Sequence, residues 1–195
     1  MLSNAWRNQS PDNYLLCYES ENSFSSTSSY VMEDYFGLLD DGEGQNILRE
    51  KSDLGIGRFP VTTAAQARIM VDKTISHLTK EHCGDWRNTV MVLGDDGDRN
   101  EHMDNANDVA AVIELHNPEI EVRKVMWDAY NRVSEARNNT YPEVYELLTK
   151  QMADGAMVFN YTGHANPISL SHEYVLNLKD FRQASAPHYP LWVTA

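Results

Sequence analysis

Short apolar runs and helix-like patterns alternate from residue 53 to residue 195. The runs hold consecutive apolar residues, as strands buried on both faces do. The pattern predicts strands at 53–59, 89–93, 121–127, 156–161 and 191–195, and helices at 62–79, 104–115, 142–152 and 180–183. Upstream it predicts a strand at 14–18, loops at 19–30 and 40–53, and a flexible N-terminal segment at 1–13.

This alternation predicts an α/β fold with a mostly parallel sheet, helices on both faces and right-handed crossovers. In such folds, ligands bind beyond the carboxyl ends of the strands. That rule selects Gly94 to Asp98, Asp128, Gly163-His164 and whatever follows Ala195.

Charge and composition exclude some classes of function. The 195 residues include 29 acidic and 16 basic side chains, with a net charge of −13. A chain this acidic is not expected to bind nucleic acid. It has no apolar run of about 18 residues, so we expect no membrane insertion. The first residues lack the pattern of a signal peptide, and Cys17 and Cys83 lack the spacing of a metal site.

His164 is the sharpest candidate for chemistry. It follows Gly163 at the end of a predicted strand, where a histidine can titrate near neutral pH and act as a general base. Gly163 allows a tight turn, and a nearby backbone N–H can serve an oxyanion. The alternative is a histidine that only caps a loop. Ser169 and Ser171 follow closely, but no nucleophile elbow surrounds them.

Several motifs together resemble one family. They are YESENS at 18–23, EDYFG at 33–37, DLGIGRFPV at 53–61, WRN at 86–88, DDGD at 95–98, HM at 102–103, NYTGH at 160–164 and PLWVTA at 190–195. In this combination the chain resembles the gingipain family (peptidase family C25) of caspase-like cysteine peptidases. Within that family it looks closest to the PorU-type C-terminal signal peptidase, or sortase, of the type IX secretion system.

The resemblance implies a caspase-like three-layer α/β/α fold and gives roles to three residues. His164 would be the catalytic histidine, Gly163 would shape its turn near the oxyanion site, and Asp53 would orient the histidine. The nucleophilic cysteine is expected about two residues beyond Ala195. Residues 14–195 would then be the N-terminal part of a catalytic domain, cut before its nucleophile and inactive as it stands.

One residue departs from the family pattern. The family usually has Gly-His-Gly, whereas Ala165 follows His164 here. Alanine is less favourable than glycine at positive φ by roughly 1 kcal/mol, so the turn is expected to differ locally.

The PorU-type resemblance also implies partners and a location. The substrates would be polypeptides that carry C-terminal signal domains, and type IX secretion components would be partners. The full-length protein would act on the outer side of the outer membrane. Catalysis of this kind needs no cofactor.

Residues 94–108 are rich in aspartate, and Asp95, Asp96 and Asp98 are candidate ligands for structural calcium. The alternative is an acidic helix start, which is electrostatically favourable. Two other functions stay open. One is a phosphoacceptor domain that uses the Asp95-Asp96 pair, and the other is a non-enzymatic acidic interaction domain stabilised by calcium.

Overall fold

The structure is a computed structural model that describes residues 18, 32–47, 49–79, 83–134, 139–166, 168–184 and 188–195. The chain divides into two compact units, Met1–Asp72 and Lys73–Ala195. Helix α1 (Ala64–Leu78) begins in the first unit and ends in the second, and it confirms the helix expected at 62–79 within a few residues. The strand expected at 14–18 lies outside the described residues except for Tyr18.

The first unit contains one prediction that is wrong. Residues 53–59 are not a strand. The backbone N–H of Asp53 donates to the carbonyl of Gly37, and the guanidinium of Arg58 forms an ion pair with Glu33 of the 3₁₀ helix η3 (Glu33–Gly37). Glycine destabilises the interior of a strand, and this segment contains Gly55 and Gly57. No strand among the described residues pairs with it. It is therefore an extended loop.

The second unit is built on a parallel sheet, as expected. Its strand order is β2-β1-β5-β9, and every neighbouring pair is parallel. The strands are β1 (Thr89–Gly94), β2 (Glu121–Met126), β5 (Val158–Thr162) and β9 (Leu191–Thr194). The helices are α2 (Glu101–His116), α3 (Pro142–Asp154) and α4 (Leu178–Gln183).

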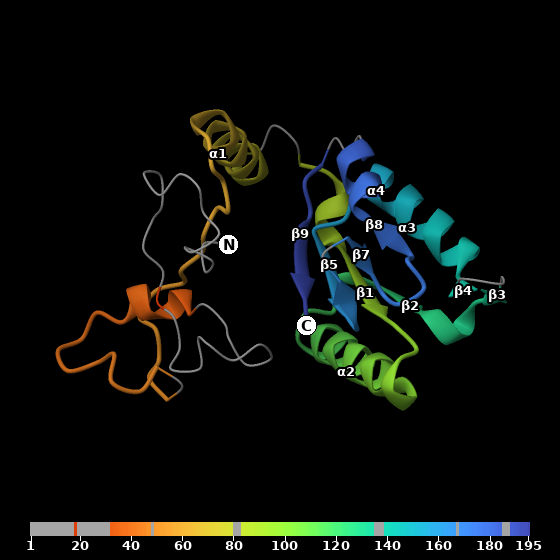
Figure 1. Cartoon of the computed structure of the whole chain (residues 1–195), viewed down its shortest axis with the longest axis horizontal. Helices are drawn as coiled ribbons and strands as arrows, with labels where there is room; N and C mark the ends of the chain where they lie inside the picture. The colour runs from red at the N-terminus through yellow and green to blue at the C-terminus, as the bar shows by residue number, and fades with distance from the viewer. Residues whose placement is uncertain are drawn as a thin grey trace. The chain divides into compact units, whose positions relative to one another are not determined.

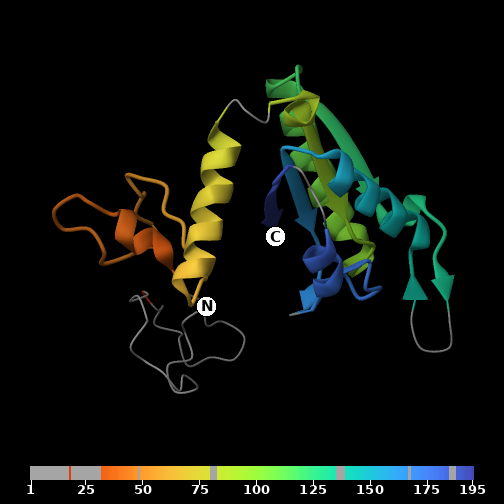
Figure 2. The same cartoon turned by 90° about the horizontal axis from the view of Figure 1, so that it is seen from above.

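Two apolar clusters show that this unit has three layers. Val90 and Val92 of β1 pack with Ala106 and Ala110 of α2. Met91 and Leu93 point to the opposite face of β1 and belong to a larger cluster that contains Val144, Leu148 and Met152 of α3. Figures 1 and 2 show the sheet between these helices. A strand buried on both faces explains why β1 is continuously apolar.

The route of the chain creates a switch point in the sheet. From β1 it crosses through α2 to β2 at one edge, and then returns through α3 to β5 on the other side of β1. Right-handed crossovers in opposite directions place α2 and α3 on opposite faces. The switch point lies between β1 and β5, and ligands bind beyond the carboxyl ends of such strands in folds of this type.

Several short elements were not expected from the sequence. They are the 3₁₀ helices η5 (Asp85–Asn88), η6 (Asp98–Asn100) and η7 (Trp127–Ala129), and the two-residue strands β3 (Val133–Ser134), β4 (Asn139–Thr140), β6 (Ala165–Asn166), β7 (Ser169–Leu170) and β8 (Leu176–Asn177). Elements of two to four residues are too short to show a period in hydrophobicity. Within the described part of the chain, none of the helices is long and apolar enough to cross a bilayer.

Gly94 tests how closely α2 packs on β1. A Cβ atom on Gly94 would lie 2.9 Å from the Cα of Met103 and 3.0 Å from the Sδ of Met126. We expect Gly94→Ala to lower the free energy of unfolding by about 1–3 kcal/mol, because the helix backbone must move to accept the methyl group. The measurement is urea denaturation followed by near-UV circular dichroism.

Gly57→Ala is the matched control, since a Cβ at Gly57 meets nothing within 4 Å. We expect it to change the free energy of unfolding by no more than about 0.5 kcal/mol. Equal stability of the two variants would contradict the close approach of α2 to β1.

Candidate active site

Asp95 holds together the two turns that follow β1 and β5. Its side chain is buried, with 2% of the residue exposed. Oδ1 accepts a hydrogen bond from the N–H of Gly97 at 2.8 Å, and Oδ2 accepts one from the N–H of His164 at 2.8 Å. A buried carboxylate is stable only when donors replace its water. The position of the His164 backbone therefore depends on Asp95.

Tyr161, on β5, adds a third donor to this carboxylate. Its hydroxyl lies 2.9 Å from Oδ2 of Asp95 and 2.7 Å from the carbonyl oxygen of His164, so its one proton is shared between two acceptors. Burial, and then the charge of Asp95, raise the pKa of Tyr161 well above its usual range. The hydroxyl is therefore a permanent donor rather than an acid in the reaction.

The contact between Asp95 and the turn before His164 requires glycine at position 163. Its φ is 156°, and a Cβ atom there would lie 2.5 Å from Oδ2 of Asp95. A side chain would therefore displace either the turn or the carboxylate. Ala165, the departure from the family pattern, is the first residue of β6 and is not among the residues with positive φ. The turn accordingly needs glycine before the histidine and not after it.

The backbone N–H groups of this turn are already engaged. The N–H of Gly163 donates to the carbonyl of Ala195 at 3.0 Å, and the N–H of His164 donates to Asp95. Neither is free to donate to an oxyanion in this structure. The catalytic role expected for Gly163 stays a prediction, and its visible contribution is to the path of the chain.

The imidazole of His164 is half-exposed and lies among other titratable groups. Its Nε2 is 3.5 Å from Oδ2 of Asp98, and 43% of its side chain is exposed. The ring of His102 meets it edge to face, with centroids 4.8 Å apart, and the ring of His172 lies 4.9 Å away on a tilted plane. A half-exposed histidine next to a carboxylate can exchange protons with a substrate.

The backbone that presents Asp98 has an unusual conformation. Asp98, Arg99 and Asn100 have φ values of 48°, 59° and 72°, so three consecutive residues other than glycine are left-handed. This conformation costs of order 1 kcal/mol per residue, and such segments cluster at functional sites. Here the segment joins the end of β1 to α2 and brings Asp98 within 3.6 Å of His102 Nε2.

Asp96 has partners of its own. Its Oδ2 accepts a hydrogen bond from the hydroxyl of Tyr141 at 2.6 Å and lies 3.9 Å from Nη1 of Arg132. Burial, together with this hydrogen bond, raises the pKa of Tyr141. Asp96 therefore ties β1 to the segment before α3.

The expected calcium ligands do not gather around one point. Asp95 binds the turn, Asp96 binds Tyr141, and Asp98 lies beside two histidines. Among the described residues, the potential ligand atoms that lie within 4.8 Å of one another are in Asp95, His102 and His164, and in Asp40, Glu43 and Asp53. The three aspartates thus do not form an all-oxygen cage, and calcium there stays a prediction.

Asp53 belongs to the first unit, and its own surroundings are simple. Its Oδ2 accepts a hydrogen bond from the N–H of Leu39 at 2.8 Å. The role expected for it, orienting His164, stays a prediction. The carboxylate that lies at ion-pair distance from the imidazole is that of Asp98.

Two further observations bear on competing functions. Asp95 is only 2% exposed and its Oδ2 accepts two hydrogen bonds, so this carboxylate is not accessible to a phosphoryl donor. Ser169 and Ser171 are buried, and the Oγ of Ser171 accepts the N–H of Glu173. Neither observation supports a nucleophile next to His164.

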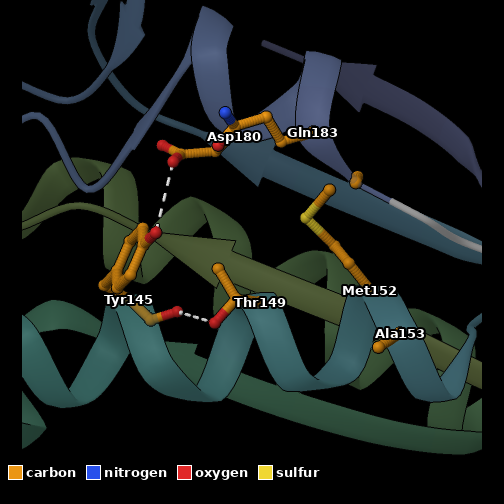
Figure 3. Close-up of a pocket in the computed structure, with 7 residues that line it drawn as sticks. Tyr145, Thr149, Met152, Ala153, Asp180 and Gln183 are labelled. Carbon is orange, nitrogen blue, oxygen red and sulfur yellow. Dashed lines mark hydrogen bonds between the residues drawn. The ribbon is translucent and has the colours of Figure 1, made fainter.

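A separate pocket lies between α3 and α4, as Figure 3 shows. Its volume is about 310 Å³, and it is lined by Tyr145, Thr149, Met152, Ala153, Asp180, Gln183 and Ala184. The hydroxyl of Tyr145 donates to Asp180 at 3.2 Å. The lining holds one carboxylate and no histidine, so it offers no pair of groups for acid–base chemistry.

The fold and this site define a class of protein. It is a caspase-like α/β domain with a histidine just after a core strand. The model of peptidase family C25 matches residues 3–195, and the chain therefore belongs to that family of gingipain-type cysteine peptidases. Comparisons with curated proteins and with solved structures gave no match.

Membership of this family has consequences for function. It makes the chain a cysteine peptidase-like domain, for which polypeptides are the class of substrate. It confirms the family inferred from the NYTGH and GIGRFP motifs. The sequence did not single out His102, Tyr161 or His172 as site residues. Of these, His102 was the most accessible to sequence reasoning, because it lies four residues after Asp98 at the start of a helix.

Replacing the Tyr161 hydroxyl tests the Asp95 cluster. We expect Tyr161→Phe to lower the free energy of unfolding by about 1–3 kcal/mol, because a buried carboxylate loses a donor. Tyr145→Phe is the matched control. It removes an exposed hydrogen bond to Asp180, and we expect a change within about 0.5 kcal/mol. Denaturant titration at neutral pH provides the measurement.

The difference in stability between the wild type and Tyr161→Phe is expected to depend on pH. The pKa of Tyr161 is raised in the folded state, so its stabilising effect is complete below the unfolded value of 10.0 and is lost as the pH rises above it. Tyr161→Phe lacks the titrating hydroxyl and does not lose stability in this way. The free energy of unfolding of the wild type should therefore approach that of Tyr161→Phe above pH 10.0. A difference that grows with pH would contradict the assignment.

Proposed function

We propose that this chain is part of the catalytic domain of a cysteine endopeptidase in which His164 moves the proton and the nucleophile lies just beyond Ala195. The observation that carries this proposal is the pairing at the carboxyl end of β9. The N–H of Ala195 donates to the carbonyl of Tyr161, and the carbonyl of Ala195 accepts the N–H of Gly163. A residue that follows Ala195 therefore emerges beside the turn that bears His164.

The position of Cys83 supports a nucleophile elsewhere. Cys83 is exposed and precedes η5, which leads into the amino end of β1. His164 lies beyond the carboxyl end of β5, which is parallel to β1. A six-residue strand is about 20 Å long, so the sheet separates this thiol from the imidazole. Cys17 lies outside the described residues.

The chemistry follows from the two groups. A cysteine thiolate attacks the carbonyl carbon of a peptide bond, and the C–N bond breaks as His164 passes a proton to the leaving amine. The acyl group then passes to water, or to an amine if the enzyme acts as a sortase. Without the thiol, the 195-residue chain is inactive. His164 can transfer a proton, but the nucleophile that would accept the acyl group is the missing cysteine.

The finer part of the proposal is the biological substrate. The motifs shared with PorU-type enzymes support removal of the C-terminal signal domain from proteins exported by type IX secretion. The full-length enzyme would then work on the outer side of the outer membrane with secretion components as partners. Its test is incubation of the full-length enzyme with an exported protein that carries such a domain, followed by mass spectrometry of the products.

Thiol labelling tests the catalytic pair directly. The chain is extended past Ala195 along its own gene, with Cys17 and Cys83 replaced by serine, and a peptidyl electrophile is added. We expect labelling of a cysteine close to the end of β9. His164→Ala should slow labelling by about 10²-fold or more, because the base is lost.

His116→Ala is the control for this experiment, since His116 is an exposed histidine in the last turn of α2. It should be labelled at the wild-type rate. Absence of a cysteine after β9, or labelling that ignores His164, would overturn the proposal. The acidic interaction domain stabilised by calcium would then be the better explanation.

A further inference from the structure

His164, the catalytic candidate, belongs to a group of two histidines and two carboxylates from separate segments. His102 lies in the first turn of α2, and His164 follows β5. Nε2 of His102 is 3.9 Å from Oδ1 of Asp95 and 3.6 Å from Oδ2 of Asp98. The ligand atoms of Asp95, His102 and His164 all lie within 4.8 Å of one another. The proposed peptidase reaction gives no role to His102.

Two imidazole nitrogens in this group have no hydrogen-bond partner among the described residues. Nε2 of His102 and Nδ1 of His164 are enclosed, and neither makes a hydrogen bond to any described residue. Enclosed polar atoms without a partner are rare in folded proteins and require an explanation, such as a bound ion. Here two such atoms belong to neighbouring imidazoles.

Gly97 lies against all three of these residues. A Cβ atom on Gly97 would lie 2.9 Å from Oδ1 of Asp95, 3.2 Å from Nδ1 of His164 and 3.3 Å from Cδ2 of His102. A side chain at this position would therefore crowd the carboxylate and both imidazoles, and glycine leaves them room to rotate toward an ion.

The distances suit a small divalent ion. Zinc binds histidine nitrogen and carboxylate oxygen at about 2.0–2.2 Å, with four ligands in a tetrahedron. Ligand atoms on such a tetrahedron are about 3.3–3.5 Å apart, and those of Asp95, His102 and His164 already lie within 4.8 Å of one another, so small side-chain rotations would bring them to an ion. Oδ2 of Asp98 lies beside this group, 3.6 Å from Nε2 of His102.

The donor set selects the kind of metal. Calcium takes six to eight oxygen ligands, whereas imidazole suits zinc and its neighbours in the first transition row. Two imidazoles with two carboxylates form a neutral site around a divalent ion. This chemistry differs from the all-aspartate calcium site expected from the sequence, although Asp95 and Asp98 belong to both.

We propose that Asp95, His102 and His164, with Asp98 beside them, form a zinc-binding site that holds the peptidase in an inactive state. A neutral imidazole has one nitrogen lone pair, and His164 cannot accept a proton while that lone pair is bound to zinc. The regulatory effect rests on the proposed function of His164. The binding of zinc does not, because it needs no nucleophile.

Isothermal titration calorimetry of the untagged 195-residue chain with Zn²⁺ tests the site, with Cys17 and Cys83 replaced by serine to remove thiol ligands. We expect one Zn²⁺ per chain and no comparable heat with Ca²⁺. His102→Gln should weaken zinc affinity by about 10- to 100-fold or more, because it removes a ligand. Asp98→Asn should weaken it less, because it removes a negative charge 3.6 Å from Nε2 of His102. Asp98 is 59% exposed at its side chain, so its variant should remain folded.

Matched controls lie on the same helix. His116→Gln and Asp104→Asn change exposed residues of α2 and should bind Zn²⁺ with wild-type affinity. Substitution with Co²⁺ adds a spectroscopic readout, since its visible bands should appear in the wild type and be lost in His102→Gln. Equal zinc affinity in His102→Gln and His116→Gln, or equal binding of Ca²⁺ and Zn²⁺, would overturn the proposal.

The two proposals fail separately. Zinc binding by the cysteine-free chain, with no thiol labelled in the extended chain, would leave a metal site in a protein that is not a peptidase. Labelling that depends on His164, with no zinc binding, would leave a peptidase without this regulation.

Discussion

The buried carboxylate of Asp95 is the group on which the rest of the site depends. It accepts hydrogen bonds from the backbone of its own turn at Gly97, from the backbone of His164 and from the hydroxyl of Tyr161. A carboxylate with 2% exposure cannot exchange these donors for water, so each of them holds the others in place. The end of β1 is thereby joined to the end of β5, and His164 is held at this junction.

The topology of the sheet explains why this linkage lies where it does. Crossovers from β1 and to β5 run in opposite directions, and the switch point between these strands is where folds of this type bind ligands. Glycine occurs at two close contacts near this point. Gly94 admits α2 against β1, and Gly163 admits the carboxylate of Asp95 against the turn before His164. Chemistry and packing therefore make the same demands on these loops.

The site concentrates features that a purely structural loop would avoid. Three consecutive left-handed residues present Asp98, and two imidazole nitrogens are enclosed without a hydrogen-bond partner among the described residues. Each feature raises the free energy of the folded state. Their convergence on the histidine of a cysteine peptidase family is consistent with function rather than stability. The pocket between α3 and α4 lacks such features.

The hydrophobic pattern of the sequence was sufficient to predict the strands β1, β2, β5 and β9. Burial on both faces of a sheet requires a continuous apolar run, which can be recognised without knowing the neighbouring strands. It was also sufficient to place His164 at a strand end. It failed at residues 53–59, where the apolar run contains two glycines and finds no strand to pair with. It also missed His102, Tyr161 and the shared role of Asp95. Asp95 acquires its role through contacts with Tyr161 and His164, which are 66 and 69 residues away along the chain, and no periodicity in the sequence encodes which distant groups a buried carboxylate will meet.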